Sequence, residues 1–134
     1  MNLFGHFQIW YWLNHRLFVY VSSPVNWTNA QKYCRQRYSD LATTHDLTDH
    51  GELLKTAGMG KFWIGLGRTR GDGVFVWSDQ SSSSFTRWKP GQPQNQLCVN
   101  VEVGYWFDRN CEDNVAFACY FGDGLQCKCR NSSR

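Results

Sequence analysis

The sequence lacks the features that mark membrane-spanning, nucleic-acid-binding and catalytic proteins. No apolar run approaches the roughly 20 residues that a membrane helix needs, and the mean hydropathy is −0.52. The formal net charge of +3 is small and its cations are scattered, which does not favour nucleic acid as the partner. Neither a G-x-S-x-G nor an H-E-x-x-H motif occurs. We therefore expect no enzyme, no membrane insertion by this chain and no nucleic-acid partner.

The chain also lacks a convincing signal peptide. Residues 1–13 have no cationic start, and Gly5 and Gln8 interrupt the apolar stretch. Either the natural N-terminus lies upstream of this sequence or the segment is an unconventional one, and the residues alone leave both open. The six cysteines and two sequons, at Asn26 and Asn131, nevertheless favour an oxidising compartment. We expect a secreted protein, or one on the extracellular side of the cell surface, with Asn26 and Asn131 as glycosylation candidates.

The length and composition predict one folded domain. The chain has 134 residues, of which 42% are hydrophobic and 16% aromatic, enough large side chains to fill a compact core. Changes in pattern divide it into an unassigned N-terminal segment at 1–16, a domain at 17–121 and a polar, basic tail at 122–134. There are no internal repeats.

Two helices are predicted after a first strand at 17–21. The first helix starts near Asn26, which is placed to be its N-cap, and carries an apolar stripe that includes Trp27 and Cys34. An asparagine that caps a helix is less free to carry a glycan. The second helix is expected at 44–57, with Leu47 in its stripe and Gly58 as its stop.

Short extended segments follow the helices. Strands are predicted at 62–66 and 74–77, joined by a two-residue hairpin turn at Asp72-Gly73, and again at 97–103 and 115–121. Polar loops are expected at 81–84 and 88–96. A strand, two helices and then a run of strands predicts an α+β fold.

Several short motifs occur in the order and spacing of a known family. They are Trp27-x-x-Ala30-x-x-x-Cys34, Leu41-Ala42, Trp63-Ile64-Gly65-Leu66, Phe75-x-Trp77-Ser78-Asp79, Trp88-x-x-Gly91-Gln92-Pro93, Cys98-Val99, Trp106-x-Asp108-x-x-Cys111 and Phe117-x-Cys119. Each motif is weak alone, but together they are specific. Over about residues 17–121 the chain resembles the C-type lectin-like domain. The resemblance implies two helices and short antiparallel sheets with a long loop region, stabilised by disulfides.

The resemblance also implies how four of the cysteines pair. It assigns Cys34–Cys119 and Cys98–Cys111, the first of which would tie the first helix to the last strand. Cys127 and Cys129 lie outside the match. Because a bond within Cys-x-Cys is strained, an interchain bond or a bond to a missing segment is an equal alternative. A disulfide-linked dimer through Cys127 or Cys129 is therefore among the expected partners.

In sugar-binding members of this family, a calcium ion on the long loop coordinates the sugar hydroxyls. The matching positions here are Gln92-Pro93-Gln94, Gln96 and Phe107-Asp108, so amides and one aromatic ring stand where carboxylates and an asparagine are usual. Only Asp108 keeps a negative charge, and the stretch from Gln94 to Cys98 is shortened. Calcium binds more tightly as carboxylates are added. We therefore expect no cofactor, with Asp108 at most a residual weak calcium ligand. The resemblance also suggests a cis bond before Pro93.

The same loop still offers a surface for contact. The candidate ligand-binding residues are Trp88, Lys89, Gln92, Gln94, Asn95, Gln96, Asn100 and Asp108. Amides donate and accept hydrogen bonds, so they suit sugar hydroxyls, and Trp and Arg suit protein interfaces equally well. Trp106 is expected in the core, whereas Trp88 is open to either role. We expect glycans or glycoproteins as ligands, with a protein ligand and no sugar binding as the alternative.

Two further motifs have ordinary explanations. Arg70-Gly71-Asp72 is the tripeptide that integrins recognise, but a turn would use the same residues and tripeptides recur by chance. The stretch from His45 to His50 carries groups that can bind a metal, yet an exposed charged helix face explains it.

Overall fold

The computed structural model describes residues 17–122, which form an α+β fold. The elements in chain order are β1 (Leu17–Val25), α2 (Trp27–Arg37), β2 (Asp40–Leu41), α3 (Leu47–Ala57), β3 (Lys61–Gly67), β4 (Val76–Trp77), β5 (Cys98–Glu102), β6 (Tyr105–Arg109) and β7 (Val115–Phe121). Within these residues, no helix is long and apolar enough to cross a membrane. The predicted α+β class is confirmed.

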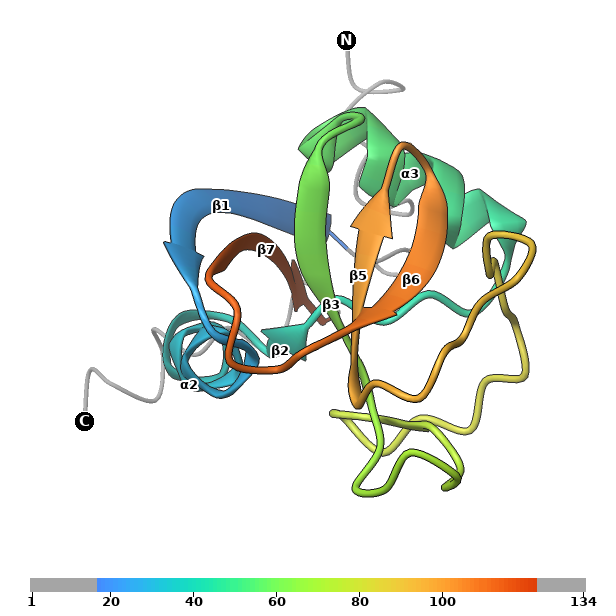
Figure 1. Ribbon diagram of the computed structural model, residues 1–134. Helices are drawn as coiled ribbons and strands as arrows, with labels where there is room; N and C mark the ends of the chain where they lie inside the picture. The colour runs from blue at the N-terminus through green and yellow to red at the C-terminus, as the bar shows by residue number, and fades with distance from the viewer. Residues whose placement is uncertain (1–16, 123–134) are drawn as a thin grey trace, which may run out of the picture.

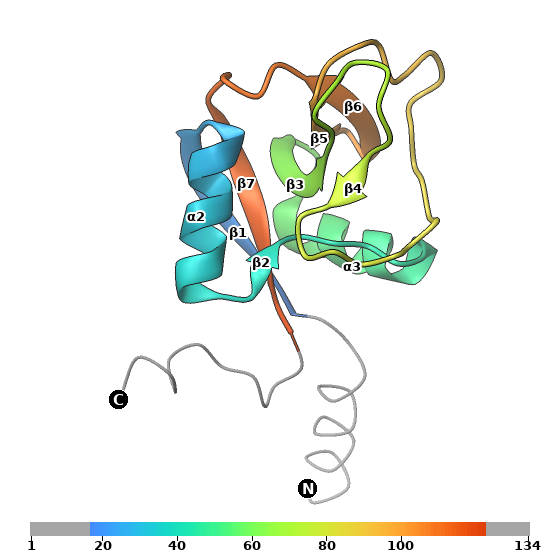
Figure 2. The same cartoon turned by 90° about the horizontal axis from the view of Figure 1, so that it is seen from below.

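The strands form one sheet in the order β1-β7-β3-β5-β6, with β2 paired to β7 and β4 paired to β3 (Figure 1). The β3–β7 pair is parallel and the other pairs are antiparallel. The first and last strands are thus neighbours, which brings the ends of the domain together. The long connection from β4 to β5 runs outside the sheet on the side of β5 and β6 (Figures 1 and 2).

Both faces of the central strands are buried, because each face is covered by a different helix. Phe62 and Ile64 of β3 pack in a cluster with Leu53 of α3, whereas Trp63 packs in a second cluster with Ala30 and Cys34 of α2. Adjacent residues of a strand point to opposite faces, so β3 divides its side chains between the two clusters. Figure 2 shows α2 and α3 on opposite sides of the sheet.

The first helix follows the sequence prediction closely. The Asn26 side chain accepts a hydrogen bond from the Asn29 N–H at 2.9 Å, which caps the helix as expected. Ala30 and Cys34 form the buried stripe. The Trp27 ring is half-buried, and its Nε1 donates to the Ile64 carbonyl at 2.9 Å. The helix is therefore fixed to β3 at its first turn.

The second helix corrects the prediction in two respects. It begins at Leu47 instead of residue 44, and Asp46 is its N-cap. Leu47 is 59% exposed, while His50 and Leu53 are the buried residues. The predicted start at residue 44 is too early. Thr43 and Thr44 precede the helix in extended chain, and both of these adjacent residues are fully buried, so their burial does not follow the period of a helix. Gly58 ends the helix as predicted, at φ 80.

The strand predictions are right in position and wrong in detail around the β3–β4 connection. The strand predicted at 74–77 is confined to β4, and residues 68–75 form a longer loop rather than a two-residue turn. Its tight turn is centred on Gly71 and Asp72, because the Gly73 N–H donates to the Arg70 carbonyl at 2.9 Å. The sequence prediction also missed two strands, β2 and β6. The first is too short to show a period.

Both predicted disulfides are present. Cys34–Cys119 joins α2 to β7, and Cys98–Cys111 joins the start of β5 to the segment after β6. The Gln92–Pro93 peptide bond is cis, as the resemblance suggested. Cys127, Cys129 and Asn131 lie outside the described residues.

His50 is buried at the contact between α3 and the β5–β6 hairpin. Its Nε2 donates to the Gly104 carbonyl at 2.8 Å, and its Nδ1 is buried without a hydrogen-bond partner among the described residues. Burial lowers the pKa of His50 below its ordinary value of 6.5; the Gly104 hydrogen bond opposes this shift and the nearby Arg87 charge adds to it. The predicted exposed charged face at 45–50 is therefore wrong for His50.

The two disulfides should contribute unequally to stability. Removing Cys34–Cys119 by a double alanine substitution is expected to lower the free energy of unfolding by about 4 kcal/mol, and removing Cys98–Cys111 by about 3 kcal/mol. The first bond spans 85 residues and the second 13, so the first bond restrains more of the unfolded chain. Urea unfolding of both variants measures the difference. A larger loss for the Cys98–Cys111 variant would contradict the loop-length argument.

Acidification should destabilise the protein through His50. Its pKa is lower in the folded than in the unfolded chain, so the unfolded chain takes up the proton first as pH falls. Stability should be complete above about pH 6.5 and decrease below it. Thermal unfolding between pH 7.5 and 5.0 should show a smaller loss of Tm in His50→Gln than in the unsubstituted protein. The exposed His45 serves as control, and an equal effect of His45→Gln would refute the assignment.

Candidate functional site

The long loop at 78–97 is fastened to β6 through Trp106. The Trp106 N–H donates to the Arg87 carbonyl at 2.8 Å, and the Trp106 carbonyl accepts from the Lys89 N–H at 3.0 Å. The rings of Phe85 and Trp88 meet the Trp106 ring edge-on, with centroids 5.7 and 5.4 Å away. Trp106 is fully buried, as predicted, and Trp88 is half-buried against it. Trp88 therefore holds the loop to the core.

Further along, the loop is held to β6 by the Asp108 carboxylate. Its side chain is 1% exposed. Oδ2 accepts hydrogen bonds from the backbone N–H groups of Gln94 and Gln96, both at 2.7 Å, and Oδ1 lies 2.8 Å from the Gln94 nitrogen. Backbone donors to a carboxylate give short, charge-assisted bonds. The residues after Pro93 are thus wrapped around this anion.

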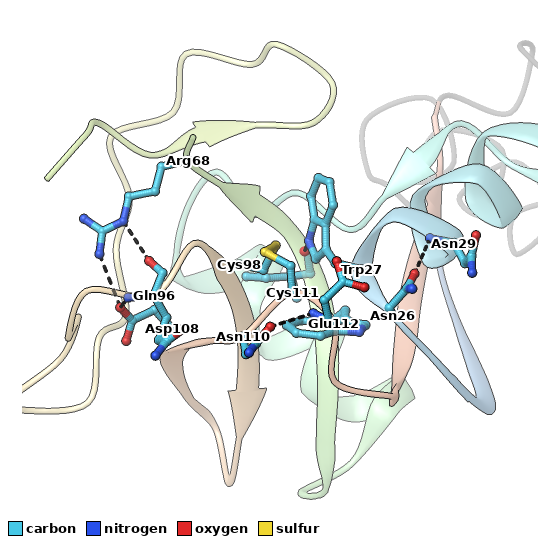
Figure 3. Close-up of a disulfide and its surroundings, with 12 residues drawn as sticks. Asn26, Trp27, Asn29, Arg68, Gln96, Cys98, Asp108, Asn110, Cys111 and Glu112 are labelled. Atoms are coloured by element: carbon cyan, nitrogen blue, oxygen red, sulfur yellow. Dashed lines mark hydrogen bonds and ion pairs between the residues drawn. A yellow bond between two sulfur atoms is a disulfide. The ribbon is translucent and has the colours of Figure 1, made fainter. Parts of the chain in front are cut away.

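Arg68, the first residue after β3, supplies the opposite charge. Its Nη2 lies 3.3 Å from Asp108 Oδ2, and its side chain is 7% exposed. Its Nε donates to the Gln96 carbonyl at 2.8 Å, and the guanidinium lies over the Phe75 ring, 4.2 Å from the centroid. Figure 3 shows the guanidinium reaching Asp108 and Gln96 together. One cation therefore joins three segments: the end of β3, the long loop and β6.

This arrangement does not fit the calcium ion that the resemblance implies. A calcium ion needs six to eight oxygens, several of them carboxylates. Here the single carboxylate already accepts two backbone hydrogen bonds and faces a guanidinium, whose charge repels a metal ion. No cluster of three or more metal-ligating side chains occurs within residues 17–122. The loop is held by an internal cation instead.

The structure separates the predicted contact residues into two groups. Gln94, Asn95 and Gln96 are exposed on the loop, and Gln92 is half-buried. Asn100 is fully buried in β5, where its Nδ2 lies 3.3 Å from Glu102 Oε2. The inclusion of Asn100 in the contact surface is therefore wrong, because β5 lies between β3 and β6 and is buried on both faces, a position that only the sheet order reveals.

Lys89, the cation among the predicted ligand-binding residues, is exposed beside Tyr105. Its Nζ lies 5.0 Å from the centre of the Tyr105 ring. Arg68, which the sequence analysis did not single out, is the decisive residue of the site. No motif marks it, because its partner Asp108 is 40 residues away and only the pairing of β3 with β5 and β5 with β6 brings them together.

The Arg70-Gly71-Asp72 tripeptide lies at an exposed turn, and its two charged side chains bind each other. Arg70 Nη2 and Asp72 Oδ2 are 2.9 Å apart, with both side chains more than 70% exposed. A receptor that binds both charged side chains would have to break the ion pair between Arg70 and Asp72. Integrin recognition stays a prediction, as does glycosylation of Asn26, whose Oδ1 is the helix cap.

Comparison with known proteins agrees with this geometry. The family model described as Lectin C-type domain matches residues 23–121. C-type lectin 1 of Hydrophis hardwickii is 32% identical, over 90% of this chain and 81% of that protein. The C-type lectin mannose-binding isoform of Notechis scutatus scutatus is 32% identical, over 87% of this chain and 81% of that protein. A calcium-independent type II antifreeze protein has the same fold, with a TM-score of 0.74 and 21% identity over 81% of this chain and 88% of that one.

Loss of the Arg68 side-chain charge should destabilise the domain. Arg68→Met leaves the Asp108 carboxylate buried without its cation, which is expected to lower the free energy of unfolding by about 3–5 kcal/mol. Chemical unfolding monitored by tryptophan fluorescence measures the change.

Arg70→Met is the matched control, because Arg70 forms an exposed ion pair in the same loop. Exposed pairs contribute about 0–1 kcal/mol. If the two variants lose the same stability, Arg68 does not hold the loop.

Proposed function

This chain belongs to the C-type lectin domain family, whose members bind ligands and catalyse no reaction, and on that premise we propose a calcium-independent recognition module for extracellular carbohydrate or glycoprotein ligands. The observation that carries the proposal is the Arg68–Asp108 pair. It occupies the single carboxylate left at the family's calcium positions.

A loop that is held by an internal cation is already shaped before a ligand arrives. Arg68 fixes the Gln96 carbonyl, and Asp108 fixes the Gln94 and Gln96 N–H groups. Preorganisation reduces the entropy that binding would otherwise lose. Ligand binding at this loop should therefore need no metal to order it.

The exposed side chains of the fixed loop suit hydroxyl-rich ligands. Gln94, Asn95 and Gln96 present amide groups to solvent, and each amide both donates and accepts. A sugar hydroxyl has the same dual character. The relative from Notechis is named a mannose-binding isoform, which supports a glycan as the ligand class without identifying the sugar.

An extracellular location is supported by the two disulfides within the domain. Such bonds persist in oxidising compartments and are rare in the cytosol. A disulfide-linked dimer through Cys127 or Cys129 belongs to the same proposal. Non-reducing electrophoresis of the secreted protein would test it.

One observation favours the alternative, a protein ligand without sugar binding. Val74 and Val76, beside the exposed turn at 70–73, are 84% and 57% exposed. Exposed apolar side chains next to charged ones are typical of protein–protein contact surfaces. This surface lies on the β3–β4 connection and β4, and its turn is next to the long loop, because a Cβ added at Gly71 would lie 2.9 Å from Asn95 Oδ1.

A glycan array probed with calcium and with chelator tests the proposal. Binding should be retained in chelator, with an apparent affinity that changes by less than about twofold, because Arg68 and Asp108 order the loop without metal. Signal that disappears in chelator would contradict the proposal, as would calorimetric calcium binding tighter than about 1 mM that Asp108→Ala abolishes.

The same protein preparation also distinguishes a glycan ligand from the alternative, a protein ligand. An array without signal, together with saturable binding to cells stripped of glycans, favours a protein ligand. A Val74→Ser, Val76→Ser variant should then weaken cell binding, whereas a Gln94→Ala, Gln96→Ala variant should not. The opposite ranking is expected for a glycan ligand.

A further inference from the structure

The outer face of the β5–β6 hairpin carries a hollow of about 280 Å³ that is separate from the Arg68–Asp108 pair. It is lined by Lys89, Glu102, Val103, Tyr105 and Phe107. Along β6, Tyr105 and Phe107 are half-buried and alternate with the buried Trp106 and Asp108. Because adjacent strand residues face opposite sides, the hollow and the buried carboxylate lie on opposite faces of β6.

Two cations stand at this hollow without an acidic partner. Lys89 Nζ and the Arg87 guanidinium carbon lie 5.0 and 5.1 Å from the centre of the Tyr105 ring. Within residues 17–122, none of the ion pairs includes Lys89 or Arg87. The ring attracts both cations, so Tyr105 holds Lys89, which lines the hollow, and Arg87, which contacts the ring without lining the hollow.

The acidic residue of the hollow, Glu102, is already paired with a cation, Arg109. Glu102 Oε2 lies 3.2 Å from Arg109 Nη1 and 3.3 Å from Asn100 Nδ2. Its Oε1 makes no hydrogen bond to a described residue and can accept from a hydroxyl. The hollow therefore combines one lining cation, Lys89, with a second cation at Tyr105, one hydrogen-bond acceptor and an apolar rim, because Val103 is 62% exposed beside Phe107.

We propose that this hollow binds an anionic sugar, whose carboxylate or sulfate group lies at Lys89, attracted also by the Arg87 charge at Tyr105, and whose ring lies on Phe107 and Val103. The acid group pairs with the cations, and a sugar hydroxyl donates to Glu102 Oε1. This inference rests on the proposed function and adds the substrate class to it.

The same features disfavour a densely charged ligand such as an acidic peptide. Glu102 lines the hollow together with Lys89, so a second anion placed along the ligand would meet a like charge. A ligand with one acid group per ring and several hydroxyls offers a group to each of the cations, the Glu102 acceptor and the apolar rim. An acidic peptide is therefore an outcome of the test and not part of the proposal.

Titration calorimetry with four probes, in chelator and at constant salt, tests the inference. The probes are a chondroitin 4-sulfate hexasaccharide, a hyaluronan hexasaccharide, neutral chitohexaose and a hexaglutamate peptide. At least one acidic saccharide should bind about tenfold more tightly than chitohexaose. Binding of both acidic saccharides indicates that a carboxylate suffices, whereas binding of the chondroitin sulfate alone indicates that sulfate is required.

Matched variants separate a built site from a general effect of charge. Arg87→Gln with Lys89→Gln should weaken acidic-saccharide binding at least about tenfold. The control is Lys32→Gln with Arg37→Gln, which removes the same charge from exposed positions of α2, at the β1–β7 end of the sheet and away from β6 (Figure 2). The control should change affinity less than about twofold.

Phe107→Ser, with its fold checked by near-ultraviolet circular dichroism, should weaken binding without any change of charge. If this variant does not fold, the charge variants decide.

Three results would overturn the inference: equal losses in the two charge variants, equally tight binding of hexaglutamate, or equally tight binding of chitohexaose. If the acidic saccharides fail while neutral glycans on the array still bind, the anionic site is wrong and the proposed function stands. If no glycan binds by either method, the proposed sugar function fails as well.

Discussion

A buried ion pair between Arg68 and Asp108 determines the shape of the binding region. The carboxylate gathers the N–H groups of the long loop, and the guanidinium closes the other side by holding the Gln96 carbonyl and the Phe75 ring. A buried charge without a partner is strongly unfavourable, so each residue requires the other. The loop, the end of β3 and β6 are consequently fixed relative to one another, and the exposed amides of the loop take their positions from this pair.

The two faces of β6 have different consequences for function. Trp106 and Asp108 point inward and hold the loop by ring packing and hydrogen bonds, while Tyr105 and Phe107 point outward and line a hollow, with Lys89 in its lining and Arg87 at the Tyr105 ring. Strand alternation alone produces this division. One five-residue strand therefore stabilises the long loop from within and carries the proposed anionic-sugar surface outside, so substitutions on the two faces should have separable effects.

The domain keeps its family's scaffold although the chemistry of the family's metal site has changed. Two disulfides and two packed faces of the sheet fix the framework without reference to the loop. A guanidinium replaces the attraction that a metal ion would exert on Asp108, and its planar fork of donors also fixes direction. It offers no open coordination position to a sugar hydroxyl. In the proposed function, ligand recognition depends on hydrogen bonds, aromatic contact and surface charge, all of which act without a metal.

The sequence by itself determined the fold and the loss of the calcium ligands, because both depend on local patterns and on the order of short motifs. The capping of α2 by Asn26, the two disulfide pairs and the cis peptide bond before Pro93 could all be predicted in this way. Only the tertiary structure decided that Arg68 meets Asp108, that Asn100 and His50 are buried, and that Arg87 and Lys89 share one ring. Each of these depends on strand register or on a contact between distant segments. Asn100 is buried because β5 lies between β3 and β6 with both faces covered, and no local pattern near Arg68 or Asn100 records which strands become neighbours.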